Sequence, residues 1–308
     1  MRSNPSSLRR IGLGCMPLSG IYGPIARDEA IKIIHGALDL GITHFDTAEL
    51  YGPYLNEELL ADALGAHRTR VEIASKFGYR LRDGKVVGLD SSPGSIRLAV
   101  DGSLRRLRRD HLDVLYQHRP DPAVPIEEVV GTMSDLVRQG KVSSLGLSAT
   151  DTQTLRRASA VHPISFVQNE FSLIQRAAET TLLPDLLGTS TEFVCYSPLG
   201  RGMLARPLLP NAQRAPSDYR SKDARYQAER LAELVDRLAP LWRISAARSV
   251  SPAAIALAWL LAKTSIIHVV PSATSVEQLK ANVRAADLVL SGMEISDLDL
   301  IGEMSARR

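Results

Sequence analysis

Eight short runs rich in Val, Ile and Leu recur along the 308-residue chain, with longer amphipathic stretches between them. This alternation predicts repeated βα units and a parallel sheet. Helix starts of the usual kind, such as Ser92-Pro93 and Ser251-Pro252, open several of the longer stretches. The expected strands are 10–16, 42–46, 71–76, 113–118, 142–148, 165–170, 192–197 and 266–271.

Eight strands, each followed by a helix, predict an α/β fold, namely a closed (β/α)8 TIM barrel in which residues 1–308 form one domain. An open doubly wound sheet would place a G-x-G-x-x-G turn after the first strand, but the sequence after Gly12 and Gly14 continues with Pro17 and lacks the third glycine. The interval after the seventh strand is far longer than one βα unit, which predicts an inserted loop at 201–224 and an inserted helix at 225–248.

A C-terminal helix over 294–304 is expected to be appended to the barrel, after the last barrel helix at 275–286. The inserted loop is rich in Pro, Arg and Ser, and a loop of that length on a barrel is usually functional.

Charge and composition exclude several classes of partner. The chain has 37 Lys+Arg against 34 Asp+Glu, spread without blocks, so nothing marks a surface for nucleic acid or anionic lipid. The longest apolar run, 253–262, is far shorter than the about 20 residues that a membrane-spanning helix needs. The N-terminus resembles no secretory signal, and Cys15 and Cys195 form neither a disulfide framework nor a metal motif. We therefore expect a cytoplasmic protein with a small-molecule substrate and no metal, and the sequence leaves the oligomeric state open.

Polar residues close most of the predicted strands. In a barrel of this kind the C-terminal strand ends form the active-site face. Each residue alone has an ordinary explanation, such as a cap or a buried histidine, but their joint occurrence indicates a site. They are Asp46, Lys76, His118, Ser148, Gln168 with Asn169, and Tyr196 with Ser197.

An aspartate, a lysine and a histidine that converge with a tyrosine supply proton transfer to a carbonyl oxygen. Tyr51 follows Asp46 on the loop that leaves the second strand. We expect Tyr51 to donate the proton, since a nearby ammonium, Lys76, lowers the pKa of a phenol. Asp46 would orient Lys76, and His118 would donate a hydrogen bond to the substrate oxygen. A lyase with Lys76 as Schiff-base nucleophile is the alternative from the barrel alone, and Tyr51 disfavours it.

The sequence resembles the aldo-keto reductase superfamily along its whole length. The resemblance is greatest to the bacterial and plant branch with Tyr-Gly-Pro after the first strand, here residues 22–24. The matching segments are FDTAELYG (45–52), ASKFG (74–78), SLRRLRRDHLDVLYQHRPDP (103–122), GKVSSLGLS (140–148), VQNEFSL (167–173), YSPLGRGML (196–204) and VVPSATSVEQLKANV (269–283).

The resemblance implies an NADP-dependent oxidoreductase of the alcohol dehydrogenase or carbonyl reductase class, which reduces aldehydes or ketones with NADPH, NADH not being excluded. It implies the same tetrad, Asp46, Tyr51, Lys76 and His118. The cofactor of such proteins binds without a Rossmann fold, in keeping with the missing glycine turn. Ser148 and Gln168 would bind the nicotinamide carboxamide, and Tyr196 would stack on the ring. The pyrophosphate would be wrapped by Ser197, Pro198, Leu199, Gly200, Arg201 and Gly202.

The chain departs from the family pattern in three places. Ala149 stands where Asn or Glu is common, and the segment LLPDLLGTSTEF after Thr181 is short and irregular. The segment expected to hold the adenosine end offers Ser272, Thr274, Gln278 and Asn282 instead of Lys or Arg beside the 2′-phosphate. This predicts a reduced preference for NADPH over NADH, unless Lys222 or Arg225 from the inserted loop reaches the adenosine end.

The substrate pocket is expected to be apolar, with some polar tips, which suits a hydrophobic carbonyl compound. A non-catalytic alternative on the same fold is a nicotinamide-binding regulatory module like the β subunits of potassium channels, and turnover of any aldehyde would separate the two. The expected pocket residues are Tyr22, Tyr54, Phe77 and Tyr79, together with the 201–224 loop.

Overall fold

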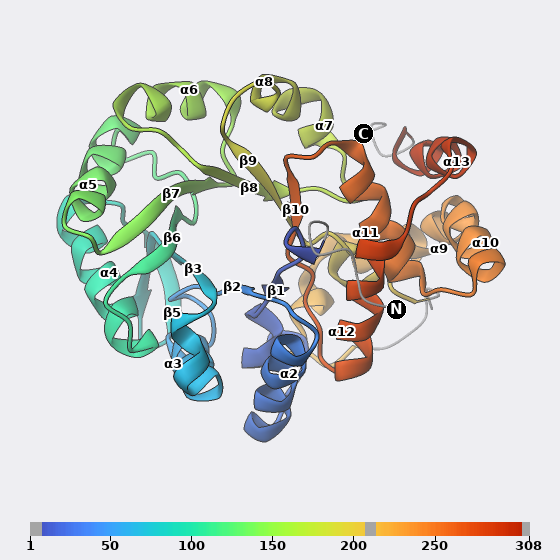
Figure 1. Ribbon diagram of the computed structural model, residues 1–308, viewed down its shortest axis with the longest axis horizontal. Helices are drawn as coiled ribbons and strands as arrows, with labels where there is room; N and C mark the ends of the chain where they lie inside the picture. The colour runs from blue at the N-terminus through green and yellow to red at the C-terminus, as the bar shows by residue number, and fades with distance from the viewer. Residues whose placement is uncertain (1–7, 207–213, 304–308) are drawn as a thin grey trace.

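The computed structural model describes residues 8–206 and 214–303. It contains an eight-stranded parallel sheet in the order β1-β2-β3-β6-β7-β8-β9-β10, curled as a TIM barrel inside a ring of helices (Figure 1). The strands are β1 (Leu13–Gly14), β2 (His44–Asp46), β3 (Glu72–Phe77), β6 (Leu112–Gln117), β7 (Val142–Ser148), β8 (Phe166–Glu170), β9 (Glu192–Tyr196) and β10 (Ile267–Val269).

The first and last strands meet and close the barrel. Ile11 forms a parallel bridge with Val269, and the Gly12 amide donates a 2.9 Å hydrogen bond to the Val269 carbonyl. The Gly14 amide donates in turn to the Pro271 carbonyl at 3.1 Å. These bonds leave neither strand with an open edge, and they confirm the barrel expected from the sequence.

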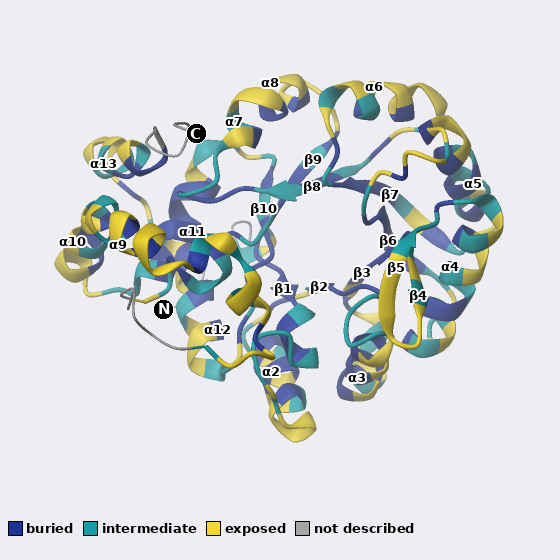
Figure 2. Ribbon diagram, turned by 180° about the vertical axis from the view of Figure 1, so that it is seen from behind, coloured by how far each residue is buried: buried dark blue, intermediate teal, exposed yellow. Residues whose placement is uncertain are grey.

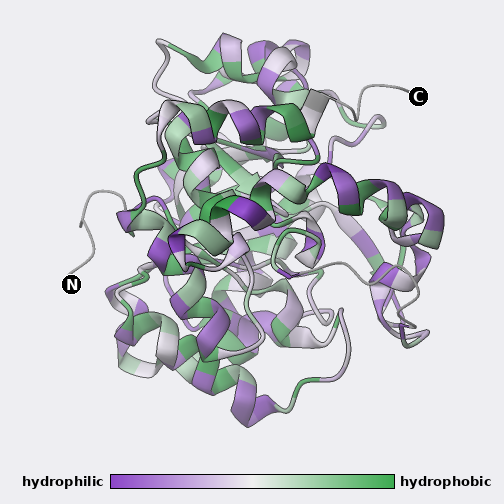
Figure 3. Cartoon of the chain, turned by 90° about the vertical axis from the view of Figure 1, so that its right-hand side faces the viewer, coloured by the Kyte–Doolittle hydropathy of each residue, from purple (hydrophilic) through white to green (hydrophobic). Residues whose placement is uncertain are grey.

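Helices cover the outside of the barrel with one apolar face each. In α5, for example, Val129, Val130, Met133 and Leu136 are buried at helical spacing against the strands. The helical layer includes α2 (Arg27–Asp39), α3 (Leu55–Leu64), α4 (Pro93–Leu107), α5 (Ile126–Arg138), α6 (Thr152–Val161), α7 (Ala177–Thr181), α8 (Leu183–Leu186), α11 (Pro252–Lys263) and α12 (Val276–Val283). Most of these helices have polar, exposed outer faces (Figures 2 and 3), but α11 is apolar and buried from Ala253 to Leu261.

Side chains from β3, β6 and β8 fill the barrel interior. Ala74, Val114 and Tyr116 form a small cluster with Phe166, separate from the core between strands and helices. Gly146 on β7 is required beside it, because a Cβ atom there would lie 2.4 Å from the ring of Tyr116. The inward face of β3 thus continues from Ala74 to Lys76, while the alternate residue Phe77 lies in the outer core.

The described part of the insertion after β9 contains three short 3-10 turns, and two helices replace the single helix expected over 225–248. The helices are α9 (Ala228–Arg237) and α10 (Ala239–Arg248), and α10 carries Pro240 in its first turn. A proline there cannot donate to the preceding turn and its ring crowds that turn, so the two helices separate. The 3-10 turns are Gly200–Gly202, Tyr219–Lys222 and Ala224–Tyr226.

Two further elements complete the fold. The appended helix α13 (Gly292–Glu303) lies beside α10 (Figure 1). An antiparallel hairpin of β4 (Tyr79–Arg82) and β5 (Lys85–Leu89), largely exposed, lies between β3 and α4 (Figure 2). Among the described residues no single helix is long and apolar enough to cross a membrane, and only α10 and α11 pass that test jointly, as a pair bent by 103°.

Candidate active site

The four residues of the expected tetrad meet at the C-terminal end of the barrel. The ammonium of Lys76 at the end of β3 donates to Asp46 Oδ1 at the end of β2, at 2.5 Å, and to the Thr47 carbonyl at 2.8 Å. The same Nζ lies 5.2 Å from the centre of the Tyr51 ring, and that ring meets His118 edge-on with centroids 5.9 Å apart. Asp46, Lys76 and His118 are buried, and Tyr51 is partly exposed at the opening.

The electrostatics of Tyr51 differ from the expectation. Desolvation raises the pKa of this phenol well above its usual value, and the Asp46 carboxylate raises it further. The pKa of Lys76 is lowered, because burial of the ammonium outweighs the pull of Asp46. The Asp46 carboxylate offsets part of the attraction between Lys76 and a phenolate, so desolvation decides the protonation of Tyr51 at rest. Tyr51 is therefore a neutral phenol that holds its proton until negative charge develops nearby.

His118 is neutral in this site. Burial holds the pKa of its imidazole well below the usual range, and the charges of Lys76 and Arg119 lower it further. Its Nδ1 atom is buried and has no hydrogen-bond partner among the described residues. A buried polar atom without a partner costs free energy, so this nitrogen adds to the cost of burying the imidazole.

Gln168 and Asn169 take part in hydrogen bonds that support the site. Gln168 Nε2 donates to Asp46 Oδ2 at 2.7 Å, so its amide holds the second oxygen of the carboxylate that binds Lys76. Asn169 is hydrogen-bonded to both the amide and the carbonyl of Thr150, at 3.1 and 2.8 Å. Ala149, which departs from the family pattern, lies between these groups with φ of +52°, a left-handed conformation that costs energy for any residue with a Cβ.

Ser148 and Tyr196 lie together at the opening, with an arginine between them that the sequence analysis did not single out. Arg119 Nη1 lies 3.4 Å from Ser148 Oγ, and its guanidinium lies 5.7 Å from the centre of the half-buried Tyr196 ring. The available signal was its position directly after His118.

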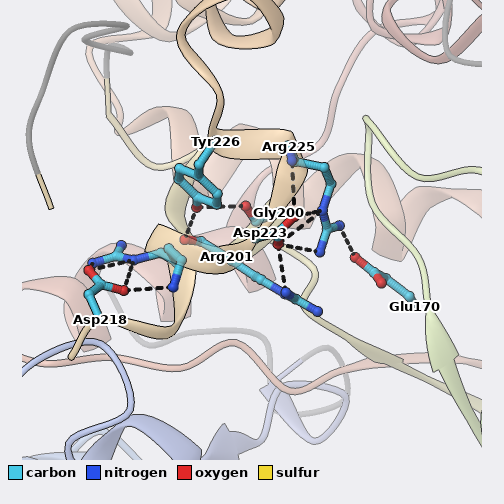
Figure 4. Close-up of polar contacts among 8 residues, drawn as sticks. Glu170, Gly200, Arg201, Asp218, Asp223, Arg225 and Tyr226 are labelled. Atoms are coloured by element: carbon cyan, nitrogen blue, oxygen red, sulfur yellow. Dashed lines mark hydrogen bonds and ion pairs between the residues drawn. The ribbon is translucent and has the colours of Figure 1, made fainter. Parts of the chain in front are cut away.

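The expected pyrophosphate segment, Ser197 to Gly202, forms a tight turn. Positive φ angles recur at Ser197 (49°), Gly200 (55°), Arg201 (55°) and Gly202 (97°). The hydroxyl of Tyr226, from the insertion, donates to the Arg201 carbonyl at 2.5 Å and holds the turn from behind (Figure 4). Repeated left-handed residues next to right-handed ones curve a backbone into the concave shape that binds anions. Pro198 and Leu199 are buried within the same turn.

Arg225 is committed to an ion-pair network in the insertion. It pairs with Glu170 at 2.6 Å and with Asp223 at 2.9 Å, and Asp223 also binds Arg201 at 2.6 Å (Figure 4). Both carboxylates engage the guanidinium of Arg225, so this residue links the insertion to the end of β8.

Lys222 borders a cavity of about 450 Å³ in the same insertion. Arg214 and Arg220 also line it, and Arg220 lies near Gly202 of the tight turn. The insertion folds back on the barrel here, since the Tyr219 amide donates to the Ile21 carbonyl at 2.9 Å. This cavity is therefore lined by cationic side chains and lies beside the expected pyrophosphate turn.

The segment after β10 is held by its own hydrogen bonds. Gln278 Oε1 accepts from the Thr274 amide at 2.9 Å, and Asn282 Nδ2 donates to the Ser272 carbonyl at 3.4 Å. Ser275 caps α12 through the Gln278 amide. These hydrogen bonds join only neutral groups, and the nearest cation of the segment is Lys280, in the last turn of α12.

The structure brings two of the four expected pocket residues to the opening. The ring of Tyr79 lies 5.1 Å from His118, and Tyr22 lies 4.7 Å below the guanidinium of Arg220. Tyr54 stacks instead on Arg106 of α4 at 4.5 Å, in the helical layer. Phe77 is buried in the outer core on the face of β3 opposite to Lys76. The alternation of side chains along β3 directs Phe77 away from the barrel opening.

Known proteins match this chain over nearly its full length. The profile of the Aldo/keto reductase family matches residues 10–303. Probable aldo-keto reductase 1 from Glycine max is 36% identical over 292 residues, which are 94% of this chain and 84% of that protein. Among solved structures, a glycerol dehydrogenase from Gluconobacter oxydans superposes with a TM-score of 0.86 at 27% identity, covering 97% of this chain and 93% of that one.

A further solved structure holds a bound cofactor. The aldo/keto reductase from Klebsiella pneumoniae, in complex with NADP and acetate, has a TM-score of 0.75 at 28% identity and covers 94% of this chain and 90% of that one. The solved structures agree with the barrel fold. The chain belongs to the Aldo/keto reductase family.

Proposed function

We propose that this chain reduces aldehydes or ketones to alcohols with NADPH, as a carbonyl reductase or alcohol dehydrogenase in the cytoplasm. The observation that carries the proposal is the convergence of Asp46, Lys76, Tyr51 and His118 at one end of the barrel. The nicotinamide cofactor, when bound, supplies the hydride, and the protein supplies position and the proton.

The residues divide the work as follows. The substrate oxygen would be held beside the hydroxyl of Tyr51 and the imidazole of His118, whose rings meet edge-on. As negative charge develops on that oxygen, Tyr51 transfers its proton, and Lys76 stabilises the phenolate that remains. Asp46 holds Lys76 in place, and Gln168 holds Asp46. His118 serves as a neutral donor, because its pKa is far too low for protonation at neutral pH.

The residues at the opening suit a nicotinamide dinucleotide. The half-buried ring of Tyr196 offers a face for stacking, and the hydroxyl of Ser148 lies beside it. The turn Ser197–Gly202 has the concave backbone that a pyrophosphate requires. The cationic cavity with Lys222 would hold the 2′-phosphate that distinguishes NADPH from NADH. NADP in the Klebsiella structure supports the same cofactor class.

A panel of aldehydes and ketones tests the proposal, with loss of NADPH absorbance as the readout. We expect turnover of at least one aldehyde by the wild-type chain and none above background by Tyr51→Phe at equal protein concentration. Cofactor binding without any turnover would favour the non-catalytic module instead. An adduct with Lys76 trapped by borohydride, formed without nicotinamide, would favour the lyase.

A further inference from the structure

A half-buried arginine stands at the opening of the site without a carboxylate partner. Arg119 Nη1 donates to the carbonyl of His118 at 2.6 Å and lies 3.4 Å from Ser148 Oγ. Both acceptors are neutral. The carboxylates near the site are taken, since Asp46 binds Lys76 and Glu170 binds Arg225. None of the ion pairs among the described residues includes Arg119.

This arrangement leaves most of the guanidinium unused. A guanidinium carries five N–H donors, and a partly desolvated cation is costly unless it is paired. The hydrogen bonds of Arg119 within the described residues engage one nitrogen, Nη1. The remaining donors form a fork whose geometry matches two carboxylate oxygens.

The location ties this charge to the reacting centre. Arg119 follows His118 directly, and its guanidinium lies 5.7 Å from the ring of Tyr196. Its positive charge acts on Tyr51, His118 and Lys76 alike, lowering the pKa of each. An anionic group a few atoms from a carbonyl placed between Tyr51 and His118 would therefore be within the field of this cation.

We infer that Arg119 recognises an anionic group on the substrate, and that the preferred substrates are aldehydes that carry a carboxylate. This inference deepens the proposed function and rests on it. The expected substrate is then no longer a hydrophobic carbonyl compound but a compound with both a carbonyl and a carboxylate group. Tyr79 and Tyr22 would then contact the short chain between the two groups, and Arg119 would bind its far end.

The test compares 4-oxobutanoate with its methyl ester, which differ only in the charge of the far end. Wild type should prefer the carboxylate in kcat/KM by roughly tenfold or more, the worth of a charge-assisted hydrogen bond. Arg119→Met should lower kcat/KM for 4-oxobutanoate about 10 to 100 times more than for the ester. Arg119→Lys should restore part of the preference, because it keeps the charge and loses the fork. Arg156→Met, an exposed arginine on α6, is the matched control and should change neither value.

Several outcomes would overturn the inference. Wild type could reduce both compounds equally well, or Arg119→Met could lower both values by the same factor. A fluorescence titration could also show that Arg119→Met weakens NADPH binding while the preference for the carboxylate persists, which would make Arg119 a cofactor contact. If wild type reduces other aldehydes of the panel but neither of these compounds, the inference fails and the proposed function stands. If wild type reduces no aldehyde at all, the proposed function fails first. Calorimetric binding of 4-oxobutanoate then decides the inference, and equal affinity in wild type and Arg119→Met refutes it.

Discussion

The surroundings of Tyr51 make its phenol a weak acid. Desolvation and the Asp46 carboxylate raise its pKa, and Lys76 is already paired. Such a proton is released only toward a group that becomes strongly basic, as a carbonyl oxygen does on hydride addition. Lys76 then has two anions to stabilise, the phenolate and Asp46. The same charges, those of Asp46 and Lys76, thus keep Tyr51 protonated at rest and stabilise its phenolate once the proton has left.

Removal of this hydroxyl should stop the reaction and spare the fold. Tyr51→Phe keeps the ring that contacts His118, so we expect turnover to fall by roughly 10²–10⁴, the usual contribution of a general acid. Thermal unfolding and NADPH affinity should stay close to wild type. Near-normal kcat in a correctly folded Tyr51→Phe protein would contradict the role of the residue.

Glu49, two residues before Tyr51, gives the stability of the protein a pH dependence. Burial, together with the nearby carboxylate of Glu57, raises the pKa of Glu49 to about 7. The folded state therefore holds this proton more tightly than the unfolded chain. Ionisation of Glu49 therefore destabilises the fold. This loss of stability is absent below pH 4.5, grows as the pH rises, and is complete above pH 7, where the buried carboxylate is charged.

Glu49→Gln removes that charge and should raise stability at high pH. The gain over wild type should be small at pH 4 and should grow to on the order of 3 kcal/mol at pH 8. Urea denaturation at both pH values measures it. Glu58→Gln, an exposed neighbour on α3, serves as the control and should show no comparable change. An equal effect of Glu49→Gln at the two pH values would rule out this account.

At the scale of elements, periodicity in the sequence predicts the repeated βα units of the barrel, but it does not predict the hairpin and the helix break that interrupt them. The strands have apolar runs bounded by turn residues, so all eight were predictable. The β4–β5 hairpin turns at Asp83-Gly84, both with positive φ, and such a pair between two short strands is a known hairpin signal outside the βα repeat. The split of α9 from α10 depends on Pro240. These signals are local, and a search for repeated units passes over them.

The insertion carries an exposed lysine near the expected pyrophosphate turn. Lys222 is exposed and borders the cavity beside the Ser197–Gly202 turn. We expect Lys222→Met to reduce the ratio of kcat/KM for NADPH over NADH by roughly tenfold, because a charge-assisted contact to the 2′-phosphate is lost. Lys141→Met, before β7, is the control and should leave the ratio unchanged. An unaltered ratio in Lys222→Met would place the 2′-phosphate elsewhere.

At the scale of the whole molecule, the barrel explains why residues far apart in sequence were predictable as one site. Asp46, Lys76 and His118 end parallel strands, and all such ends lie on one face, so spacing alone groups them. Side-chain direction is harder to infer. Phe77 follows Lys76 and points outward, and Gln168 turns to Asp46 instead of lying open. Arg119 escaped notice because one arginine among many has no sequence signature, and its lack of a carboxylate is visible only in three dimensions.

The C-terminal helix is bound to the barrel through Asp299, which makes the stability of the two parts interdependent. Its side chain accepts from the buried indole of Trp259 at 2.9 Å and from Lys263 at 2.6 Å, both on α11. The Asp299 carbonyl accepts from Arg176 at 2.6 Å. Together with the β1–β10 closure, these contacts support our proposal that the chain is a single domain.

Asp299→Ala tests this proposal, because it leaves the indole N–H of Trp259 without its acceptor. An unsatisfied buried donor costs about 1–3 kcal/mol. In a single domain this lowers the free energy of unfolding of the whole chain. Far-UV circular dichroism reports on all the helices, whereas tryptophan fluorescence reports only on Trp242 and Trp259, the two tryptophans of the chain, in α10 and α11. We expect both signals to shift together to lower urea in Asp299→Ala, in one transition. Asp299→Asn, which keeps an acceptor for the indole, should shift them less. A fluorescence transition that moves alone would show that the region of α10 and α11 unfolds separately from the rest of the chain.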